Sequence, residues 1–342
     1  MESLYGIDVG VGSIKLVSIV KEKDKLVLQD LAEAETPDVD WLRSKDKNNS
    51  MAAVSKIIKS LVAEAKLKTK KVVTCLPEDE VVSRLIRLPP IKENEIKDAL
   101  KFEAETFVPF PLSQASIDYE IIEKDDMGRM SVFTIAAKNE TIQSFVKLFK
   151  MTGLELVAIE SPATALRRVM ASAVSTTVTM LVADLGEKFS DIIGISDNKV
   201  YFTRAVPVGG ESLTRAISVN LGLDMASAEQ YKKAYGLNEM ELEGKIKSAI
   251  IPVFSSMAEE IRRALGSFRE ELNKSVGLLV LSGGGANLPG FAEELARLLG
   301  VEVQVVQPFI NLDVSRVTPV VNMTSEGCRF SLAVGLALRG LA

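Results

Sequence analysis

The chain of 342 residues contains no histidine. This absence excludes mechanisms that need a histidine base, a histidine metal ligand or a Ser-His pair, and so removes most hydrolase and metalloenzyme classes. Only two cysteines occur, Cys75 and Cys328, far apart and each in an apolar stretch. They form neither a zinc-binding spacing nor a disulfide framework, which is typical of a protein from a reducing cytosol.

Long apolar runs and an excess of positive charge are also missing. The most apolar stretches are shorter than the ~18 residues that a membrane span needs. The N-terminus lacks the basic flank of a signal peptide, and residues 335–342 do not form a basic amphipathic anchor. We therefore expect no direct membrane insertion. The net charge of −5 argues against nucleic acid as a partner, because nucleic-acid binding normally needs a basic face.

One pattern of strands occurs twice in the chain. The hydrophobic content of 47% is ample for a buried core, and the length suggests about two domains. Each half begins with a strand, an Asp-x-Gly turn and a second strand, so we predict an architectural duplication. The strands expected in the two copies are Leu4–Val9, Ile14–Val20, Leu26–Glu33, Val178–Asp184, Asp191–Ser196 and Val200–Pro207.

Other elements are predicted around these copies. A separate small unit is expected from about residue 80 to 157. It would hold strands Val81–Leu88, Ala115–Glu123 and Met130–Ala137 with helices Glu93–Phe107 and Glu140–Met151. Late in the chain we predict strand Leu278–Ser282 and helices Glu211–Leu221, Ser227–Tyr235, Glu243–Leu272, Phe291–Leu299 and Ser325–Leu338.

The two Asp-x-Gly turns are the strongest candidates for chemistry. Asp8 and Asp184 end the first strand of their copies, and Gly10 and Gly186 follow two residues later. A glycine-rich hairpin lets backbone N–H groups approach phosphate oxygens, and a carboxylate beside them can hold Mg²⁺. Lys15, on the following strand, would reach a phosphate. A single such turn also fits an ordinary β-hairpin; the pair favours the phosphate site.

A third glycine-rich segment follows a buried strand near the end of the chain. Residues 283–287 read Gly-Gly-Gly-Ala-Asn and lead into a predicted helix. Such a loop lets a flat base lie against bare backbone, and a helix N-terminus favours anions. It has neither the Walker nor the Rossmann spacing. A flexible strand-to-helix connection is the alternative.

The order of these motifs resembles the superfamily of actins, heat-shock chaperones and sugar kinases. The resemblance implies an α/β, actin-like (ribonuclease H-like) fold of two lobes with a duplicated mixed sheet. The inserted unit, including residues 84–89, 103–110 and 118–119, together with residues 207–214, resembles the PilM family of type IV pilus assembly proteins. The implied subdomains are 1A (1–79, 158–175, 318–342), 1C (80–157), 2A (176–208, 276–317) and 2B (209–275).

The same resemblance implies roles for individual residues. Asp8 and Asp184 would face Mg²⁺, and Glu160 would orient an attacking water; a carboxylate that favours a helix N-terminus is the alternative for Glu160. For Glu229 and Lys232 the alternative is a surface ion pair. The residues implied for ATP contacts are Gly10, Gly12, Ser13, Lys15, Gly186, Gly209, Gly210, Glu229, Lys232, Gly283, Gly284, Gly285 and Asn287. Glu187, beside Gly186, departs from the small residue usual in relatives, which implies at most a slow ATPase.

The family resemblance also implies a partner and a location. PilM proteins bind the N-terminal cytoplasmic tail of the membrane protein PilN between subdomains 1A and 1C, so we expect a cytoplasmic scaffold held at the inner membrane through that partner. One alternative is an FtsA-like protein that polymerises under the membrane, which leaves self-association open. Others are a small-molecule kinase of the same superfamily and a relative from type II secretion.

Overall fold

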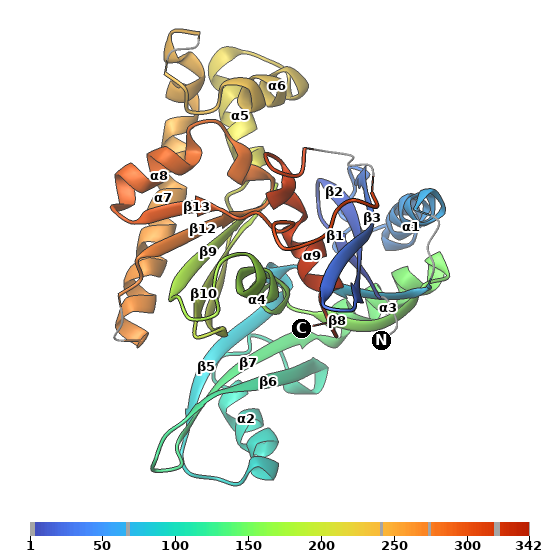
Figure 1. The fold of residues 1–342 in the computed structure, drawn as a ribbon, viewed down its shortest axis with the longest axis vertical. Coiled ribbons are helices and arrows are strands. Elements are labelled where there is room, and N and C mark those ends of the chain that lie inside the picture. The colour runs from blue at the N-terminus through green and yellow to red at the C-terminus, as the bar shows by residue number, and fades with distance from the viewer. Residues whose placement is uncertain (1–3, 66–68, 240–241, 273–274, 318–321, 342) are drawn as a thin grey trace.

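The computed structural model describes residues 4–65, 69–239, 242–272, 275–317 and 322–341, and these residues form three sheets. Two sheets have five strands each and share one topology; the third has three strands. Figure 1 shows the two larger sheets on either side of helices α4 and α9, with the third sheet projecting below them. Within the described residues, no helix is long and apolar enough to cross a membrane.

The first sheet has the strand order β3-β2-β1-β4-β8. Strands β1 to β3 form an antiparallel meander, and β4 and β8 run parallel to β1. Residues 16–19 of β2 are all buried, so both faces of the strand are covered there, since successive side chains point to opposite faces. The bounds are β1 Leu4–Val9, β2 Ser13–Glu22, β3 Lys25–Glu35, β4 Lys71–Cys75 and β8 Glu155–Glu160.

The second sheet repeats this plan in the order β11-β10-β9-β12-β13. Its meander is again antiparallel, and β12 and β13 run parallel to β9. The predicted duplication is therefore confirmed at the level of strand order. The bounds are β9 Met180–Leu185, β10 Ser190–Ser196, β11 Lys199–Val206, β12 Leu278–Ser282 and β13 Glu302–Val305.

The third sheet, with the order β5-β7-β6, is inserted between β4 and β8 of the first sheet. Helix α2 covers it, but α3 packs on α1 beside the first sheet instead. The boundary predicted at residue 157 falls inside β8, an edge strand that the sequence did not reveal. The subdomain limits thus remain a prediction. The bounds are β5 Val81–Leu88, β6 Ala115–Lys124, β7 Met130–Lys138, α1 Lys47–Glu64, α2 Ile96–Ala104 and α3 Asn139–Thr152.

Helices α4 and α9 pack against each other between the two larger sheets (Figure 1). Gly335 permits this packing, because a Cβ on it would lie 2.2 Å from the carbonyl oxygen of Ala165. Gly6 in turn lets α9 pack on β1, where a Cβ would lie 2.3 Å from the carbonyl oxygen of Ala333. The subdomain start predicted at residue 318 lies outside the described residues. The remaining bounds are α4 Pro162–Ala173, α5 Gly210–Leu221, α6 Met225–Tyr235, α7 Lys245–Leu272, α8 Phe291–Leu299 and α9 Ser331–Ala337.

Candidate nucleotide site

The first hairpin, residues 8–15, joins β1 to β2. Asp8 pairs across the two strands with Lys15, whose Nζ lies 3.8 Å from Asp8 Oδ2. Thr36 supports the turn from β3's end, since its hydroxyl donates to the carbonyl of Gly10 at 2.7 Å and its N–H to that of Gly12 at 3.1 Å. The hairpin therefore places a carboxylate, an ammonium group and bare glycine backbone at one edge of the first sheet.

The second hairpin, residues 184–191, joins β9 to β10 and is fixed to the start of α5. The N–H groups of Gly210 and Glu211 donate to the carbonyls of Gly186 and Glu187 at 3.0 and 2.8 Å. Two helix N-terminal donors are thus used to hold the hairpin, and Gly209 and Gly210 lie directly beside it. This arrangement brings Asp184 and the start of α5 to the same edge of the second sheet.

The aspartates of the two hairpins influence each other. Burial raises the pKa of Asp8 to about 6; Lys15 lowers it, and the charges of Asp184 and Glu33 raise it further. Burial also raises the pKa of Asp184, with Ser282 and Lys15 acting in the opposite direction. One lysine therefore serves two carboxylates in a poorly solvated place, and a divalent cation would neutralise the remaining negative charge.

The donor set fits magnesium better than a metal held by protein ligands alone. Within the described parts of the chain, no three histidine, cysteine, aspartate or glutamate side chains converge as a metal-binding group. Mg²⁺ commonly binds one or two carboxylates and completes its shell with water and phosphate oxygens. Asp8 and Asp184 are the residues that could hold it in that manner.

The glycine loop, residues 283–287, packs directly against the second hairpin. Gly283 has a φ of +80°, which favours glycine, and a Cβ on it would lie 2.6 Å from the carbonyl oxygen of Leu185 and 2.9 Å from Asp184 Oδ1. Asn287 accepts a hydrogen bond from Cys328 Sγ at 2.9 Å. The loop, with Gly284 and Gly285 in a short 3₁₀ turn, is therefore brought to the predicted site.

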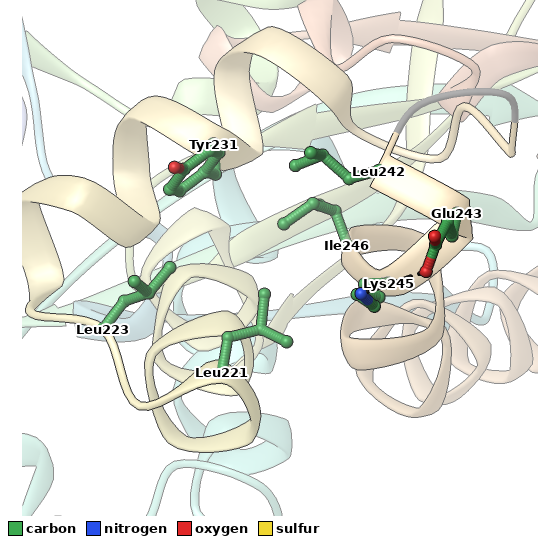
Figure 2. A pocket seen from close by; sticks show the side chains of 7 residues that line it. All are labelled: Leu221, Leu223, Tyr231, Leu242, Glu243, Lys245 and Ile246. Carbon is green, nitrogen blue, oxygen red and sulfur yellow. Dashed lines mark ion pairs between the residues drawn. The ribbon is translucent and has the colours of Figure 1, made fainter.

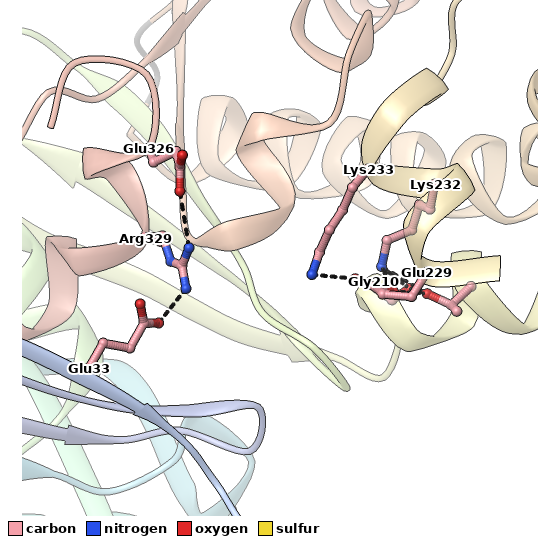
Figure 3. Close-up of polar contacts among 8 residues, drawn as sticks. Glu33, Gly210, Glu229, Lys232, Lys233, Glu326 and Arg329 are labelled. Atoms are coloured by element: carbon pink, nitrogen blue, oxygen red, sulfur yellow. Dashed lines mark hydrogen bonds and ion pairs between the residues drawn. The ribbon is translucent and has the colours of Figure 1, made fainter. Parts of the chain in front are cut away.

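Lys232 and Glu229 hold α6 against α5. Lys232 Nζ donates to the carbonyl of Gly210 at 3.0 Å and to Thr214 Oγ1 at 2.8 Å, and it pairs with Glu229 Oε2 at 2.6 Å (Figure 3). Burial lowers the pKa of Lys232, and Glu229 opposes that shift. The pair therefore supports the start of α5, and the predicted contacts with ribose or adenine stay a prediction.

Glu160 lies in a cluster of arginines. Its side chain is 4% exposed, and its two oxygens pair separately with Arg168 of α4 and Arg339, which follows α9. Arg168 also donates to the carbonyl of Gly335. Both carboxylate oxygens are engaged, so the arrangement favours a role in holding α4, α9 and β8 together over the predicted orientation of a water molecule.

Glu33 on β3 is a site residue that the motifs did not reveal. It lies opposite Lys15 in the register, 3.9 Å from Lys15 Nζ, and it accepts from Arg329 at 2.5 Å. Arg329 follows Cys328, whose carbonyl accepts from the N–H of Gly283. The ion pairs of Glu33 with Lys15 and with Arg329, the second of which is drawn in Figure 3, and this backbone hydrogen bond therefore link the first hairpin to the glycine loop. Nothing in the sequence pointed to Arg329.

A further pair of acids lies behind the second hairpin. Asp191 is the cross-strand neighbour of Asp184, and burial followed by the charge of Glu78 raises its pKa well above the usual range. Burial raises the pKa of Glu78 to about 7, and Oε2 of this side chain has no hydrogen-bond partner. Glu78 follows β4 of the first sheet, so these two acids meet across the two lobes.

A cavity of about 300 Å³ lies between α5, α6 and α7, away from the hairpins (Figure 2). Glu243 and Lys245 form an ion pair of 3.0 Å at its edge. Its apolar lining comes from Leu221, Leu223, Tyr231, Leu242 and Ile246. None of the residues predicted to bind ATP lines this cavity.

Comparisons with known proteins place these features in a family. A model of the family described as "Type IV pilus assembly protein PilM" matches residues 6–341. Among solved structures, a chain of a PilM-PilN type IV pilus biogenesis complex is similar at a TM-score of 0.86 and 28% identity, over 99% of this chain and 98% of that chain.

Two more distant structures share the fold. The ethanolamine utilization protein EutJ from Carboxydothermus hydrogenoformans gives a TM-score of 0.61 at 18% identity, over 99% of this chain and 90% of that chain. MreB 5 of Spiroplasma citri bound to AMPPNP gives a TM-score of 0.55 at 13% identity, over 100% of this chain and 96% of that chain. The predicted actin-like α/β fold is confirmed.

Proposed function

The chain belongs to the PilM family of type IV pilus assembly proteins, and from this membership we propose that it is an ATP-binding scaffold of the pilus assembly machine. The observation that supports nucleotide binding most strongly is the meeting of Asp8, Lys15 and Asp184 from two equivalent hairpins. Two carboxylates and one ammonium group in a poorly solvated place are suited to a Mg²⁺-polyphosphate.

The residues proposed to bind ATP come from both lobes. Lys15 and the glycine backbone of the first hairpin would contact the β- and γ-phosphates. Asp8 and Asp184 would hold Mg²⁺, whose charge offsets that of the phosphates. The glycine loop would receive the adenosine, beside Asp184 and Leu185. Because both oxygens of Glu160 are paired with arginines, we expect at most slow hydrolysis of ATP.

The partner in this proposal is a membrane protein. One structure similar to this chain is described as a complex of PilM with PilN. We propose that this chain likewise binds the N-terminal cytoplasmic tail of a PilN-like protein, in a groove between the first sheet and the inserted third sheet. It would then be cytoplasmic and held at the inner membrane by that tail.

Two titrations of the full chain test the proposal. Calorimetry would measure the Kd for Mg-ATP and, separately, for a synthetic peptide of a PilN-like tail, each with and without the other ligand. We expect both ligands to bind, and ATP turnover to remain slow. Failure of both ligands to bind the folded chain would contradict the proposed function; binding of the peptide alone would contradict only its nucleotide part.

A further inference from the structure

The side chain of Glu187 reaches from the second hairpin onto the first. A Cβ built on Gly12 would lie only 1.9 Å from Glu187 Oε2, 3.1 Å from its Cδ and 3.7 Å from its Cβ. The length of this side chain therefore lies along the bare backbone of Gly12. The glycine that would let a phosphate approach the first hairpin is the same glycine that Glu187 covers.

The surroundings of Glu187 leave its charge poorly compensated. Partial burial raises the pKa of this carboxyl, Glu211 and Glu229 raise it further, and Lys232 and Lys188 lower it. Among the residues that the structure describes, no lysine or arginine forms an ion pair with Glu187. Glu187 is an exposed residue, so a ligand can displace its side chain by rotation of the χ angles.

We propose that Glu187 occupies the place between the two hairpins that the terminal phosphate of a nucleoside triphosphate would take, and that it thereby sets the preference of the site between di- and triphosphates. The inference rests on the proposed nucleotide binding. A triphosphate must move the carboxylate away from Gly12 and then tolerates a like charge nearby, which is costly in a confined space. A diphosphate ends before this place and leaves Glu187 where it lies. Glu187 is thus a specificity-determining residue.

The test compares nucleotides on matched variants of the full chain. Calorimetry gives the Kd for Mg-ATP and Mg-ADP with the wild type, Glu187→Gln, Glu187→Ala and the control Glu211→Gln. Glu187→Gln removes the charge and keeps the size of the side chain, and Glu187→Ala removes both. Glu211→Gln removes an equal charge from the adjacent start of α5, where its side chain pairs with Arg215.

We expect both Glu187 variants to shift the ratio of the two Kd values toward ATP by about tenfold, chiefly by tightening ATP. Glu211→Gln should shift the ratio much less. Tripolyphosphate and pyrophosphate lack a base and a ribose. For this pair, both Glu187 variants should shift the ratio of the Kd values toward tripolyphosphate in the same way.

An unchanged ratio in both Glu187 variants would overturn the inference and leave nucleotide binding intact. Weaker ATP binding in Glu187→Gln would also overturn it, because the carboxylate would then assist the triphosphate. If no protein in the series binds either nucleotide while all unfold cooperatively on heating, the proposed nucleotide binding itself fails, and the inference with it.

Discussion

The two hairpins are equivalent in topology but differ in charge. In the first, the cross-strand neighbour of Asp8 is Lys15; in the second, the cross-strand neighbour of Asp184 is Asp191. The first sheet therefore supplies a cation for its own carboxylate, and the second sheet adds another acid. The two copies share the backbone arrangement and the aspartate near the end of the first strand, but they differ in the charge of the residue across from that aspartate.

This difference assigns separate tasks to the two lobes. In the first hairpin, Lys15 lies between Asp8 and Glu33, which offset its charge, and its side chain is only 12% exposed. The second hairpin carries Asp184, Glu187 and Asp191 against a single cation, Lys188. Under the proposed function, the Mg²⁺ that accompanies the nucleotide would offset this excess of negative charge. A Mg²⁺-nucleotide would therefore join the two lobes electrostatically, which neither hairpin can do alone.

The largest effect on stability is expected at a position where β1 of the first sheet has glycine and the equivalent position of β9 has valine. Gly6 precedes Asp8 by two residues, as Val182 precedes Asp184. A Cβ on Gly6 would lie 2.3 Å from the carbonyl oxygen of Ala333 and 2.6 Å from the backbone nitrogen of Ala337. Backbone atoms cannot give way easily, so Gly6→Ala should lower the free energy of unfolding by about 3 kcal/mol or more. Urea denaturation measures this.

Two controls sharpen that comparison. Val182→Ala should cost about 2 kcal/mol, because it only trims a buried side chain. Gly266→Ala, in α7 with no atom within 4 Å of the added Cβ, should be neutral or stabilising by about 0.5–1 kcal/mol. If Gly6→Ala lowered the free energy of unfolding no more than Gly266→Ala, the close packing of α9 on β1 would be contradicted.

The next effect concerns Lys15, because only in the first hairpin is the cross-strand neighbour of the leading aspartate a cation. Lys15→Ala should weaken Mg-ATP binding by about 10- to 100-fold without unfolding the protein, because a charge-assisted hydrogen bond to phosphate is lost. Asp8→Ala should weaken it as well, through loss of the Mg²⁺ contact. Calorimetry with Lys188→Ala as the control, a lysine of the second hairpin, measures the difference. Equal losses of Mg-ATP affinity in Lys15→Ala and Lys188→Ala would contradict the proposed difference between the two hairpins.

A smaller effect, on the pH dependence of stability, is expected for Glu78, which interacts with Asp191 of the second lobe. The folded-state pKa of Glu78 is about 7, above its usual 4.5, so its proton favours the folded state. The stability that protonation provides is present below pH 4.5 and is lost as the pH rises through about 7. Glu78→Gln should therefore stabilise the protein by about 1–2 kcal/mol at pH 8 and change little at pH 4.

Thermal unfolding of both proteins from pH 4 to 8 measures this dependence. Asp79 and Asp191 act on the same group, and Asp191 has its own raised pKa, so Glu78→Gln should keep part of the pH dependence. A stability difference that does not grow with pH would contradict the shared burial of these acids.

The smallest effect is expected for an exposed lysine of the second lobe. Lys233 pairs with Glu229 at 3.2 Å, but its side chain is 74% exposed. Lys233→Ala should change the free energies of unfolding and of Mg-ATP binding by less than about 0.5 kcal/mol, since solvent screens such a pair. A loss of affinity as large as that of Lys15→Ala would show that cations of the two lobes act alike, contrary to the comparison above.

The strands and helices with strong local patterns could be predicted. Strands β1, β5 and β12 and helix α8 have the predicted bounds. β1 and β12 are short runs of buried residues followed by glycine, and the buried residues of α8 lie four positions apart. Strands β8 and β13 were missed. Both are short edge strands with several exposed positions, so their hydrophobic pattern is weak. The predicted helix Glu93–Phe107 is shorter in the structure, where α2 ends at Ala104.

The candidate site was predictable only where a motif marks it. Asp8, Asp184 and the glycine loop were found from their local sequence, and the structure brings them together. The partners of Glu160 and the contact of Glu187 with Gly12 were not predictable, because each joins residues from different elements. Such contacts depend on how the lobes pack, which local periodicity does not encode.

By itself, the sequence determined a duplicated α/β fold and an aspartate at the end of the first strand of each copy. These are local properties, set by periodicity, turn glycines and the order of elements. Only the tertiary structure decided which charges face each aspartate, and that Glu187 covers Gly12. The reason is physical: a charge acts through distance and solvent exposure, and both are fixed only when the two lobes are packed together.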